Sequence, residues 1–305
     1  MSFHRNLTDR LKSQGHPICL GVDPDLPPHL TFLHNELARL DVEEYLYRFT
    51  NAIILAAESK CSVLKFQSAY FEAFGPKGLS ALKKGIELAK SKKMLCILDA
   101  KRGDISSTMH AYGRAAFELY QADALTVTPY LGWDVLSPLI PWLQKDKGVY
   151  LVWLTSNPSA TDVQDLLVTH QGTTGEYLLH LAELFLKNAA AHSVGSSIGL
   201  VAGATKIADH QTLLNRIGAG RKYLIPGVGA QGGAFDSCLA KTISDNPESL
   251  IPISRGIVDL KWKPEISPPT WSLFSECIRG NLNTYIDHWR RLTGSEDRVK
   301  NATKP

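Results

Sequence analysis

Four charged residues near the ends of two apolar segments are the part of this sequence best suited to chemistry. Lys65 closes the apolar run SVLKF, and the run MLCILDAK ends on Asp99 and Lys101, with Asp104 in the loop that follows. Side chains alternate along a strand, so Asp99 and Lys101, two residues apart, project to the same side. An isolated Asp-x-Lys pair could be a structural ion pair, but burying two lysines and two aspartates together costs folding energy with no evident structural return. The pattern therefore predicts a functional array of alternating lysines and aspartates.

Eight short apolar runs are the candidate strands that would position these side chains. They cover residues 17–23, 62–66, 94–101, 124–128, 148–156, 198–204, 222–229 and 250–257. Amphipathic stretches between them, with apolar residues at three- and four-residue spacing, predict helices over 41–59, 80–92, 106–121, 176–192 and 205–217. Eight strands alternating with helices favour an α/β fold of the (β/α)8 TIM barrel type over an open doubly wound sheet, with the active site at the carboxyl ends of the strands.

The chain is expected to form one domain over residues 1–305, since barrels of this kind reach such a length around a single core. A polar segment at 157–176 departs from the alternation and is expected to be a lid or an extra helix. A helix over 271–292 is expected to complete the barrel, and the charged tail at 294–305 is expected to fray.

Two glycine-bearing loops predict a phosphate site. IPGVGAQGG, which contains Gly229, ends the seventh run, and SRGI, which contains Arg255 and Gly256, ends the eighth. Glycines let backbone amides approach an anion closely, and a guanidinium beside a helix start adds a charge-assisted donor. Tight turns would account for the glycines of either loop alone. Arg255, directly after an apolar run, favours the phosphate-binding type of barrel.

These motifs together resemble the orotidine 5′-phosphate decarboxylase family. LDAKRGDI, with Lys65 one strand earlier, is similar to the family's Asp-x-Lys-x-x-Asp signature, and the resemblance runs from GVDPD through LKFQSAYFE, VTPYLG, SNPS and PGVGAQGG to SRGI. The length of the chain resembles the longer bacterial branch. The resemblance implies decarboxylation of orotidine 5′-monophosphate to uridine 5′-monophosphate and CO2, the last step of de novo pyrimidine synthesis. It also implies a reaction without metal or cofactor and a homodimer with shared active sites.

The resemblance also implies roles for the charged array. Lys101 is expected to donate the proton and Asp99 to lie beside the departing carboxylate, while Lys65 and Asp104 hold Lys101 in place. Asp104 and Thr108 match positions that reach into the neighbouring subunit's site. An ordinary N-terminal helical turn is the alternative for Thr108.

The remaining implied contacts are with the nucleotide. Gln231 and Arg255 are expected to hold the phosphate, Asp23 to bind a ribose hydroxyl and Ser156 to read the pyrimidine amide. Asp23 precedes a proline and could instead cap a turn. Ser156 could instead cap the segment that follows it.

Two other functions are compatible with a barrel of this kind. A related barrel uses the same motif with Mg2+ to stabilise an enediolate formed from a sugar phosphate, but a lysine at position 65 would repel the metal. A catalytically silent nucleotide-binding module is disfavoured because it would have little reason to keep two lysines and two aspartates facing one cavity.

Composition and residue placement indicate which partners, compartment and metals to expect. The net charge of +3 comes from 33 basic and 30 acidic residues spread along the chain, which argues against nucleic-acid binding. The first 14 residues are polar and charged and no later stretch has about 18 apolar residues, so we expect neither export nor membrane insertion. The five cysteines are odd in number and scattered, which favours a reducing cytoplasm. Histidines such as His16 and His110 do not accompany carboxylates or cysteines at strand ends, so no metal site is expected.

Overall fold

The computed structural model describes residues 3–24, 31–170, 173–229, 233, 235–258 and 270–294. Within these residues, the eight apolar runs form eight parallel strands of one sheet. The strands are β1 (Ile18–Val22), β2 (Val63–Gln67), β3 (Leu95–Arg102), β4 (Ala124–Val127), β5 (Gly148–Leu154), β8 (Ile198–Ala202), β9 (Tyr223–Leu224) and β10 (Ile251–Ile253).

The sheet closes on itself as a barrel. Its strand order is β10-β1-β2-β3-β4-β5-β8-β9, and the two outermost strands meet through a parallel bridge between Leu224 and Leu250. The amide of Ile225 donates to the carbonyl of Leu250 at 2.8 Å, and the amide of Leu250 donates to Tyr223 at 2.7 Å. A closed ring leaves no sheet edge, and the predicted (β/α)8 barrel is confirmed.

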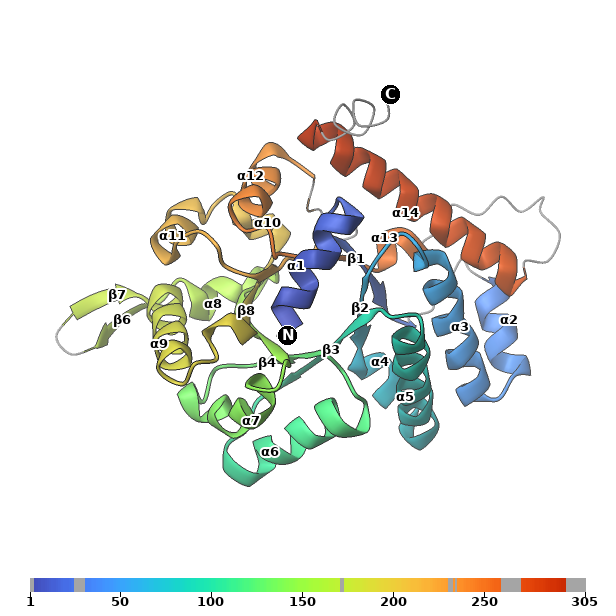
Figure 1. Cartoon of the computed structure of the whole chain (residues 1–305), viewed down its shortest axis with the longest axis horizontal. Coiled ribbons are helices and arrows are strands. Elements are labelled where there is room, and N and C mark those ends of the chain that lie inside the picture. Colours follow the sequence, from blue (N-terminus) through green and yellow to red (C-terminus); the bar gives the residue numbers. More distant parts are fainter. Residues whose placement is uncertain are drawn as a thin grey trace.

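Helices surround the barrel in a ring (Figure 1). The longer ones are α1 (Phe3–Gln14), α2 (Thr31–Arg39), α3 (Val42–Ala57), α5 (Gly75–Ser91), α6 (Ser106–Arg114), α9 (Tyr177–Ala191), α11 (Gln211–Ile217), α12 (Ser237–Asp245) and α14 (Trp271–Thr293). The shorter ones are α4 (Ser68–Glu72), α7 (Ile140–Leu143), α8 (Thr161–Gln164), α10 (Ala204–Ile207) and α13 (Arg255–Val258). Single helical turns are η1 (Ala115–Leu119), η2 (Gly132–Val135), η3 (Ser137–Leu139), η4 (Pro158–Ala160) and η5 (Gly195–Ser197).

Two of the long helices, α3 and α14, begin at residues whose side chains cap them. Asp41 accepts a hydrogen bond from the amide of Glu43 at the start of α3, and Thr270 accepts one from Leu273 at the start of α14. The left-handed Gly294 ends α14, as a C-terminal glycine commonly does. The predicted helix at 271–292 is therefore present, whereas the tail beyond 294 lies outside the described residues.

The amino-terminal helix closes one end of the barrel. In Figure 1, α1 lies across the middle of the ring of helices. Its buried Phe3, Leu7 and Leu11 belong to the same apolar cluster as Cys19 and Leu95, which lie near the beginnings of their strands. The opposite end, where the strands finish, is left for the charged residues.

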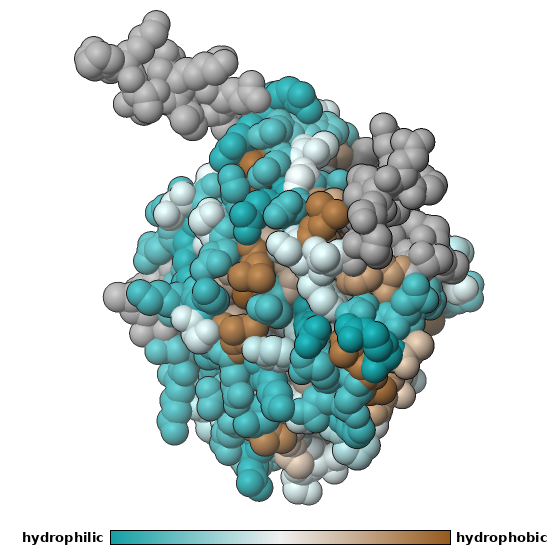
Figure 2. Space-filling view, turned by 90° about the vertical axis from the view of Figure 1, so that its right-hand side faces the viewer, coloured by the Kyte–Doolittle hydropathy of each residue, from teal (hydrophilic) through white to brown (hydrophobic). Residues whose placement is uncertain are grey.

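The outer surface of the helices is mostly hydrophilic. Figure 2 shows the side of the molecule that lies on the right of Figure 1, where α2, α3 and α14 are found, and apolar residues appear there only in small separate groups. Small groups of this kind are ordinary for a folded protein surface. No helix within the described residues combines the length and the apolar character needed to cross a membrane.

The segment at 157–176 is not the single extra helix offered as one interpretation. It contains η4, the four-residue α8 and an antiparallel hairpin of β6 (Leu167–His170) and β7 (Thr173–Glu176) that projects from the barrel in Figure 1. The predicted helix at 205–217 is also wrong as one element, since a turn separates α10 from α11. In that turn the ring of His210 bonds the carbonyl of Lys206 at 2.9 Å, and local side-chain bonds of this kind compete with continued helix.

Acid should destabilise the fold through His16, which is buried beside the start of β1. Its Nε2 donates to the carbonyl of Lys60 at 3.1 Å, so its unprotonated Nδ1 accepts from the amide of Ile18 at 3.3 Å. Burial, helped by Arg290, lowers the pKa of His16 from 6.5 to about 4. The folded protein therefore binds fewer protons than the unfolded chain below pH 6.5, and stability present above that pH is lost as pH falls toward 4.

We expect this loss to reach about 3 kcal/mol in the free energy of unfolding between pH 7 and pH 4. Urea titrations of wild type and His16→Gln across this range measure it, because the variant should lack most of the slope. The same change at the exposed His192 is the control and should keep it. Equal slopes in wild type and His16→Gln would contradict the assignment.

Candidate active site

The end of β3 has an irregular backbone that presents Asp99 and Lys101. Leu98 pairs with Leu125 of β4, but the next pair joins Arg102 to Val127, so β3 carries two more residues than its neighbour over this stretch. Lys101 lies in this bulge with a left-handed φ of 47°. Such a conformation costs a non-glycine residue about 1–3 kcal/mol, and bulges often redirect side chains beside active sites.

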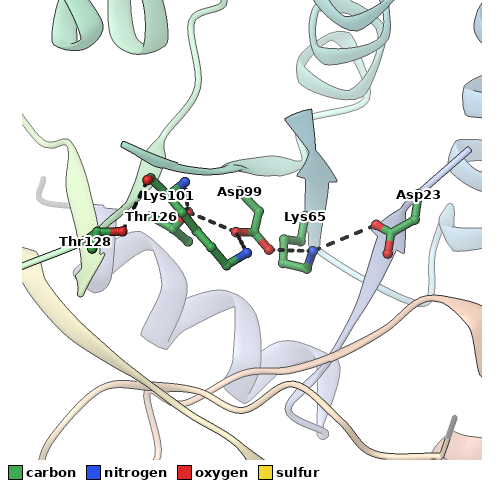
Figure 3. Close-up of polar contacts among 6 residues, drawn as sticks. All are labelled: Asp23, Lys65, Asp99, Lys101, Thr126 and Thr128. Carbon is green, nitrogen blue, oxygen red and sulfur yellow. Dashed lines mark hydrogen bonds and ion pairs between the residues drawn. The ribbon is translucent and has the colours of Figure 1, made fainter. Parts of the chain in front are cut away.

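Three of the four residues of the predicted charged array, Lys65, Asp99 and Lys101, lie together, with Asp23 in place of Asp104. Figure 3 shows Asp23, just after β1, then Lys65 on β2, and Asp99 and Lys101 on β3. Lys65 Nζ lies 2.9 Å from Asp99 Oδ2 and 3.8 Å from Asp23 Oδ1. Lys101 Nζ lies 2.7 Å from Asp99 Oδ1. Asp99 is therefore bound by one ammonium on each oxygen.

Burial makes this arrangement depend on charge pairing. The side chains of Lys65 and Asp99 are only 6% and 9% exposed, whereas that of Lys101 is 48% exposed. Burial by itself would lower the pKa of Lys65, but Asp99 and Asp23 outweigh it and raise that pKa. Burial would raise the pKa of Asp99, but Lys65 and Lys101 outweigh it and hold that pKa well below its ordinary value. Both groups stay charged at neutral pH.

A cavity of about 440 Å³ opens at this end of the barrel, a size ordinary for a small-molecule site. Residues from the ends of all eight strands, or from the loops after them, line it. Seven of the predicted site residues are among them: Asp23, Lys65, Asp99, Lys101, Ser156, Arg255 and Gly256. The sequence patterns at separate strand ends thus meet in one place.

The other predicted residues lie elsewhere. Asp104 and Thr108 do not line the cavity of their own chain. Asp104 precedes α6 and accepts a hydrogen bond from the amide of Ile105 at 2.8 Å, so it lies outside the helix that contains Thr108. Gln231 lies outside the described residues.

Gly229 allows its loop to adopt a conformation that other residues would not tolerate. Its φ of 84° favours glycine, and a Cβ there would come within 2.7 Å of the Tyr285 hydroxyl. Its amide donates to the carbonyl of Gly233 at 2.8 Å. Close packing and turning, the alternative considered for this loop, therefore account for Gly229.

The loop after β10 places the guanidinium of Arg255 at the cavity. The amides of Ile257 and Val258 both donate to the carbonyl of Ser254, which bends the chain into a turn and places Arg255 and Gly256 at the lining. Arg255 is exposed and makes no ion pair with a described residue. A guanidinium at the mouth of a barrel is suited to bind a phosphate.

Asp23 and Ser156 line the cavity from opposite sides of the sheet order, after β1 and β5. Asp23 Oδ1 is buried and makes no hydrogen bond to a described residue, apart from its 3.8 Å ion pair with Lys65. Ser156 follows β5, and the cap position of the next turn is Asn157 instead.

Sequence reasoning missed Thr126 of β4, which lines the cavity. Its hydroxyl donates to Asp99 Oδ1 at 2.9 Å and accepts from the amide of Lys101 at 2.9 Å. It also missed Gln67, Thr155 and Asn157 in the lining. The signal for Thr126 was present as a polar residue inside the run ALTVT, but threonine is also an ordinary strand residue.

Comparison with known proteins decides the family. The model of the orotidine 5′-phosphate decarboxylase / HUMPS family matches residues 17–265. This chain belongs to that family. Orotidine 5′-phosphate decarboxylase of Clostridium acetobutylicum is 35% identical over 282 residues, which cover 90% of this chain and 93% of that protein. The enzyme of Petrotoga mobilis is 36% identical over 260 residues, covering 83% and 86%.

Solved structures agree with the family assignment. The putative orotidine-monophosphate decarboxylase of Toxoplasma gondii superimposes with a TM-score of 0.74 at 28% identity, covering 97% of this chain and 98% of that one. The putative orotidine 5′-phosphate decarboxylase of Streptomyces avermitilis has a TM-score of 0.74 at 29% identity, covering 96% of each chain.

Proposed function

We infer that this chain decarboxylates orotidine 5′-monophosphate to uridine 5′-monophosphate and CO2, the last step of de novo UMP biosynthesis. Family membership supports the reaction class, a carboxy-lyase. The observation that carries the mechanism is Asp99, buried in the cavity with an ammonium within 3 Å of each of its oxygens. No purely structural need accounts for placing these charges at the cavity.

We propose that Lys101 performs the central step. When the bond between C6 and the carboxylate breaks, its electron pair stays on C6 in the plane of the ring, where neither carbonyl can delocalise it. A fixed ammonium stabilises this developing charge and then donates a proton to C6, giving uridine 5′-monophosphate. The half-exposed Lys101 is the lysine whose ammonium can reach a ligand, since Lys65 is buried between two aspartates.

Asp99 and Lys65 have supporting roles in this proposal. Asp99 holds the ammonium of Lys101 at 2.7 Å and lies beside the departing carboxylate. Lys65 keeps Asp99 ionised from its other side, because the charge of Lys65 helps to depress the pKa of Asp99. The chemistry then needs no metal or organic cofactor.

The Mg2+-dependent alternative is disfavoured by the position of Lys65. Its ammonium lies 2.9 Å from Asp99 and thus occupies the place beside the carboxylate that a cation would take. Within the described part of the chain, no three His, Cys, Asp or Glu side chains gather to hold a metal ion.

We propose that the nucleotide lies across the cavity with its phosphate at Arg255, Gly256 and Gln231. Gly229 would shape that loop, and Asp23 would accept a hydrogen bond from a ribose hydroxyl through its unbonded oxygen. Ser156, on the far side of the barrel mouth from Asp23, would read the pyrimidine amide. The segment at 157–176 would then lie next to the base.

We propose that the active unit is a homodimer in which Asp104 and Thr108 enter the partner's site. Apolar side chains are exposed on α6 and the loops next to it, and they support an interface there: Ile105 is 45% exposed, Tyr112 36%, Tyr130 79% and Leu131 48%. Asp104 would then add a second carboxylate near Lys101 of the partner subunit.

We also propose a cytoplasmic location. All five cysteines are free, and Cys19, Cys61 and Cys96 are buried within the fold. Burial raises the pKa of the Cys19 thiol to about 12, so it stays protonated and unreactive. Free structural thiols suit a reducing compartment.

The direct test of function is loss of the ultraviolet absorbance of orotidine 5′-monophosphate in the presence of a chelator. We expect conversion to uridine 5′-monophosphate without added metal. Activity only on a sugar phosphate, and only with Mg2+, would instead indicate the related barrel enzymes that stabilise an enediolate. Tight nucleotide binding without conversion would indicate that the protein is a catalytically silent nucleotide-binding module.

Removing the guanidinium of Arg255 should weaken use of the phosphorylated substrate. A charge-assisted hydrogen bond contributes about 1.5–3 kcal/mol, so Arg255→Ala should lower kcat/KM for orotidine 5′-monophosphate by about 10- to 100-fold. Orotidine, which lacks the phosphate, is the control substrate and should react equally with both enzymes. Equal losses on both substrates would show that Arg255 does not act on the phosphate.

A further inference from the structure

The peptide group of Lys101 is bound by two threonine side chains. Lys101 lies in the bulge, between the paired residues Leu98 and Arg102 and outside the backbone ladder that joins β3 to β4. Its N–H donates to Thr126 Oγ1 at 2.9 Å, and its C=O accepts from Thr128 Oγ1 at 3.2 Å (Figure 3). Thr126 on β4 and Thr128 just after β4 therefore bind the N–H and the C=O of the residue with the left-handed φ.

The Thr126 hydroxyl also binds the acidic partner of Lys101. It accepts from the amide of Lys101 and donates to Asp99 Oδ1, the same oxygen that lies 2.7 Å from Lys101 Nζ. One buried oxygen, on a residue only 1% exposed, thus fixes the backbone of the lysine and the carboxylate that binds its ammonium. Only a group that donates and accepts at once can do this, which a hydroxyl can and a methyl cannot.

The residues after Lys101 keep the bulge in place from other directions. Arg102 forms an ion pair with Glu72 of α4 and lies over the ring of Tyr112, so its side chain is held away from the cavity. A Cβ on Gly103 would come within 3.1 Å of the Thr128 carbonyl oxygen, so glycine allows this close approach. Lys101 is the residue of this segment that is directed into the cavity.

We propose that Thr126 is a positioning residue for the decarboxylation, with Thr128 in an auxiliary role. The inference rests on the proposed function of Lys101 and goes beyond it, because it assigns the geometry of Lys101 to a hydroxyl on another strand. The role of Thr126 in the proposal is to position other residues of the site, not to contact the substrate. It acts by holding the strained backbone that aims the ammonium, and by orienting Asp99.

The decisive variants are Thr126→Val, which keeps the shape and removes the hydroxyl, and Thr126→Ser, which keeps the hydroxyl. A misplacement of about 1 Å can cost on the order of 100-fold in rate, so we expect Thr126→Val to lower kcat by about that factor. KM should stay within about twofold, because the nucleotide contacts lie elsewhere. Thr126→Ser should recover kcat to within about fivefold of wild type, since a hydroxyl restores both hydrogen bonds.

Thr50→Val is the matched control. Thr50 is a fully buried threonine of α3 whose hydroxyl makes no hydrogen bond to a described residue, so its loss should leave kcat unchanged. A kcat for Thr126→Val within about threefold of wild type would overturn the proposal. So would a loss in Thr126→Ser as large as that in Thr126→Val, because the hydroxyl would then be irrelevant.

Failure of the proposed function would look different, since wild type itself would not convert orotidine 5′-monophosphate. A crystal structure of Thr126→Val decides the inference in that case. We expect the φ of Lys101 to leave the left-handed region and its ammonium to leave Asp99. An unchanged Lys101 in the variant would overturn the positioning role without any reference to activity.

Discussion

Lys101→Ala should lower the rate of decarboxylation by at least about 10,000-fold, because it removes the proton donor and the positive charge beside C6 together. Its affinity for uridine 5′-monophosphate should stay within about threefold of wild type, since the product has no carboxylate and leaves its phosphate and ribose contacts intact. Single-turnover decay of orotidine 5′-monophosphate absorbance measures the rate, and calorimetric titration measures the affinity.

The matched control is Lys83→Ala. Lys83 is 42% exposed and lies 2.7 Å from a carboxylate of Glu87, so its exposure and ion pairing resemble those of Lys101, but it lies on the outer helix α5. We expect wild-type kinetics from it. If Lys101→Ala kept more than about 1% of the wild-type rate, another group would have to supply the proton.

The eight strands could be predicted because parallel strands of a barrel are buried on both faces. β1 and β8, for example, have every residue buried, and they appear in the sequence as unbroken apolar runs. The hairpin of β6 and β7 had no such signal. Three of the four residues of β6 are exposed, so its pairing leaves no apolar pattern that distinguishes it from a loop.

The charged residues of the site could be predicted for a related reason. Lys65 and Asp99 interrupt runs that are otherwise apolar, and such interruptions at strand ends are costly unless they serve a function. Thr126 could not be found in this way, because a threonine within a strand is also favoured by its β-branched shape. Its importance depends on the register shift between β3 and β4, which involves two strands and cannot be derived from either one.

The proposed roles of Asp104 and Thr108 depend on a second subunit and cannot be read from one chain. Their positions outside their own cavity agree with a role in a partner's site, but nothing in one chain brings them to Lys101. Their roles stay predictions. An interface built on Ile105 and Tyr112 is the arrangement that would bring them there.

Lys65→Met should destabilise the fold by about 3–5 kcal/mol at pH 7, because it leaves the carboxylates of Asp99 and Asp23 without their shared buried partner. Urea titration measures the loss. The matched control is Lys92→Met, which breaks an exposed ion pair with Glu58 at 3.0 Å and should cost no more than about 1 kcal/mol. A loss in Lys65→Met no larger than in the control would show that the buried array does not stabilise the fold.

Two further measurements connect this loss to Asp99. Without Lys65 the pKa of Asp99 should rise, so the deficit of Lys65→Met should shrink as pH falls below 3.8, the ordinary value for this carboxyl, because protonation removes the unpaired charge. Adding Asp99→Asn should likewise recover part of the stability, with a coupling energy measured by the double-mutant cycle. Activity should not return in the double variant, because Lys101 would have lost the carboxylate that holds its ammonium. Recovery of stability without recovery of rate would show that the same buried charges stabilise the fold and arrange the site.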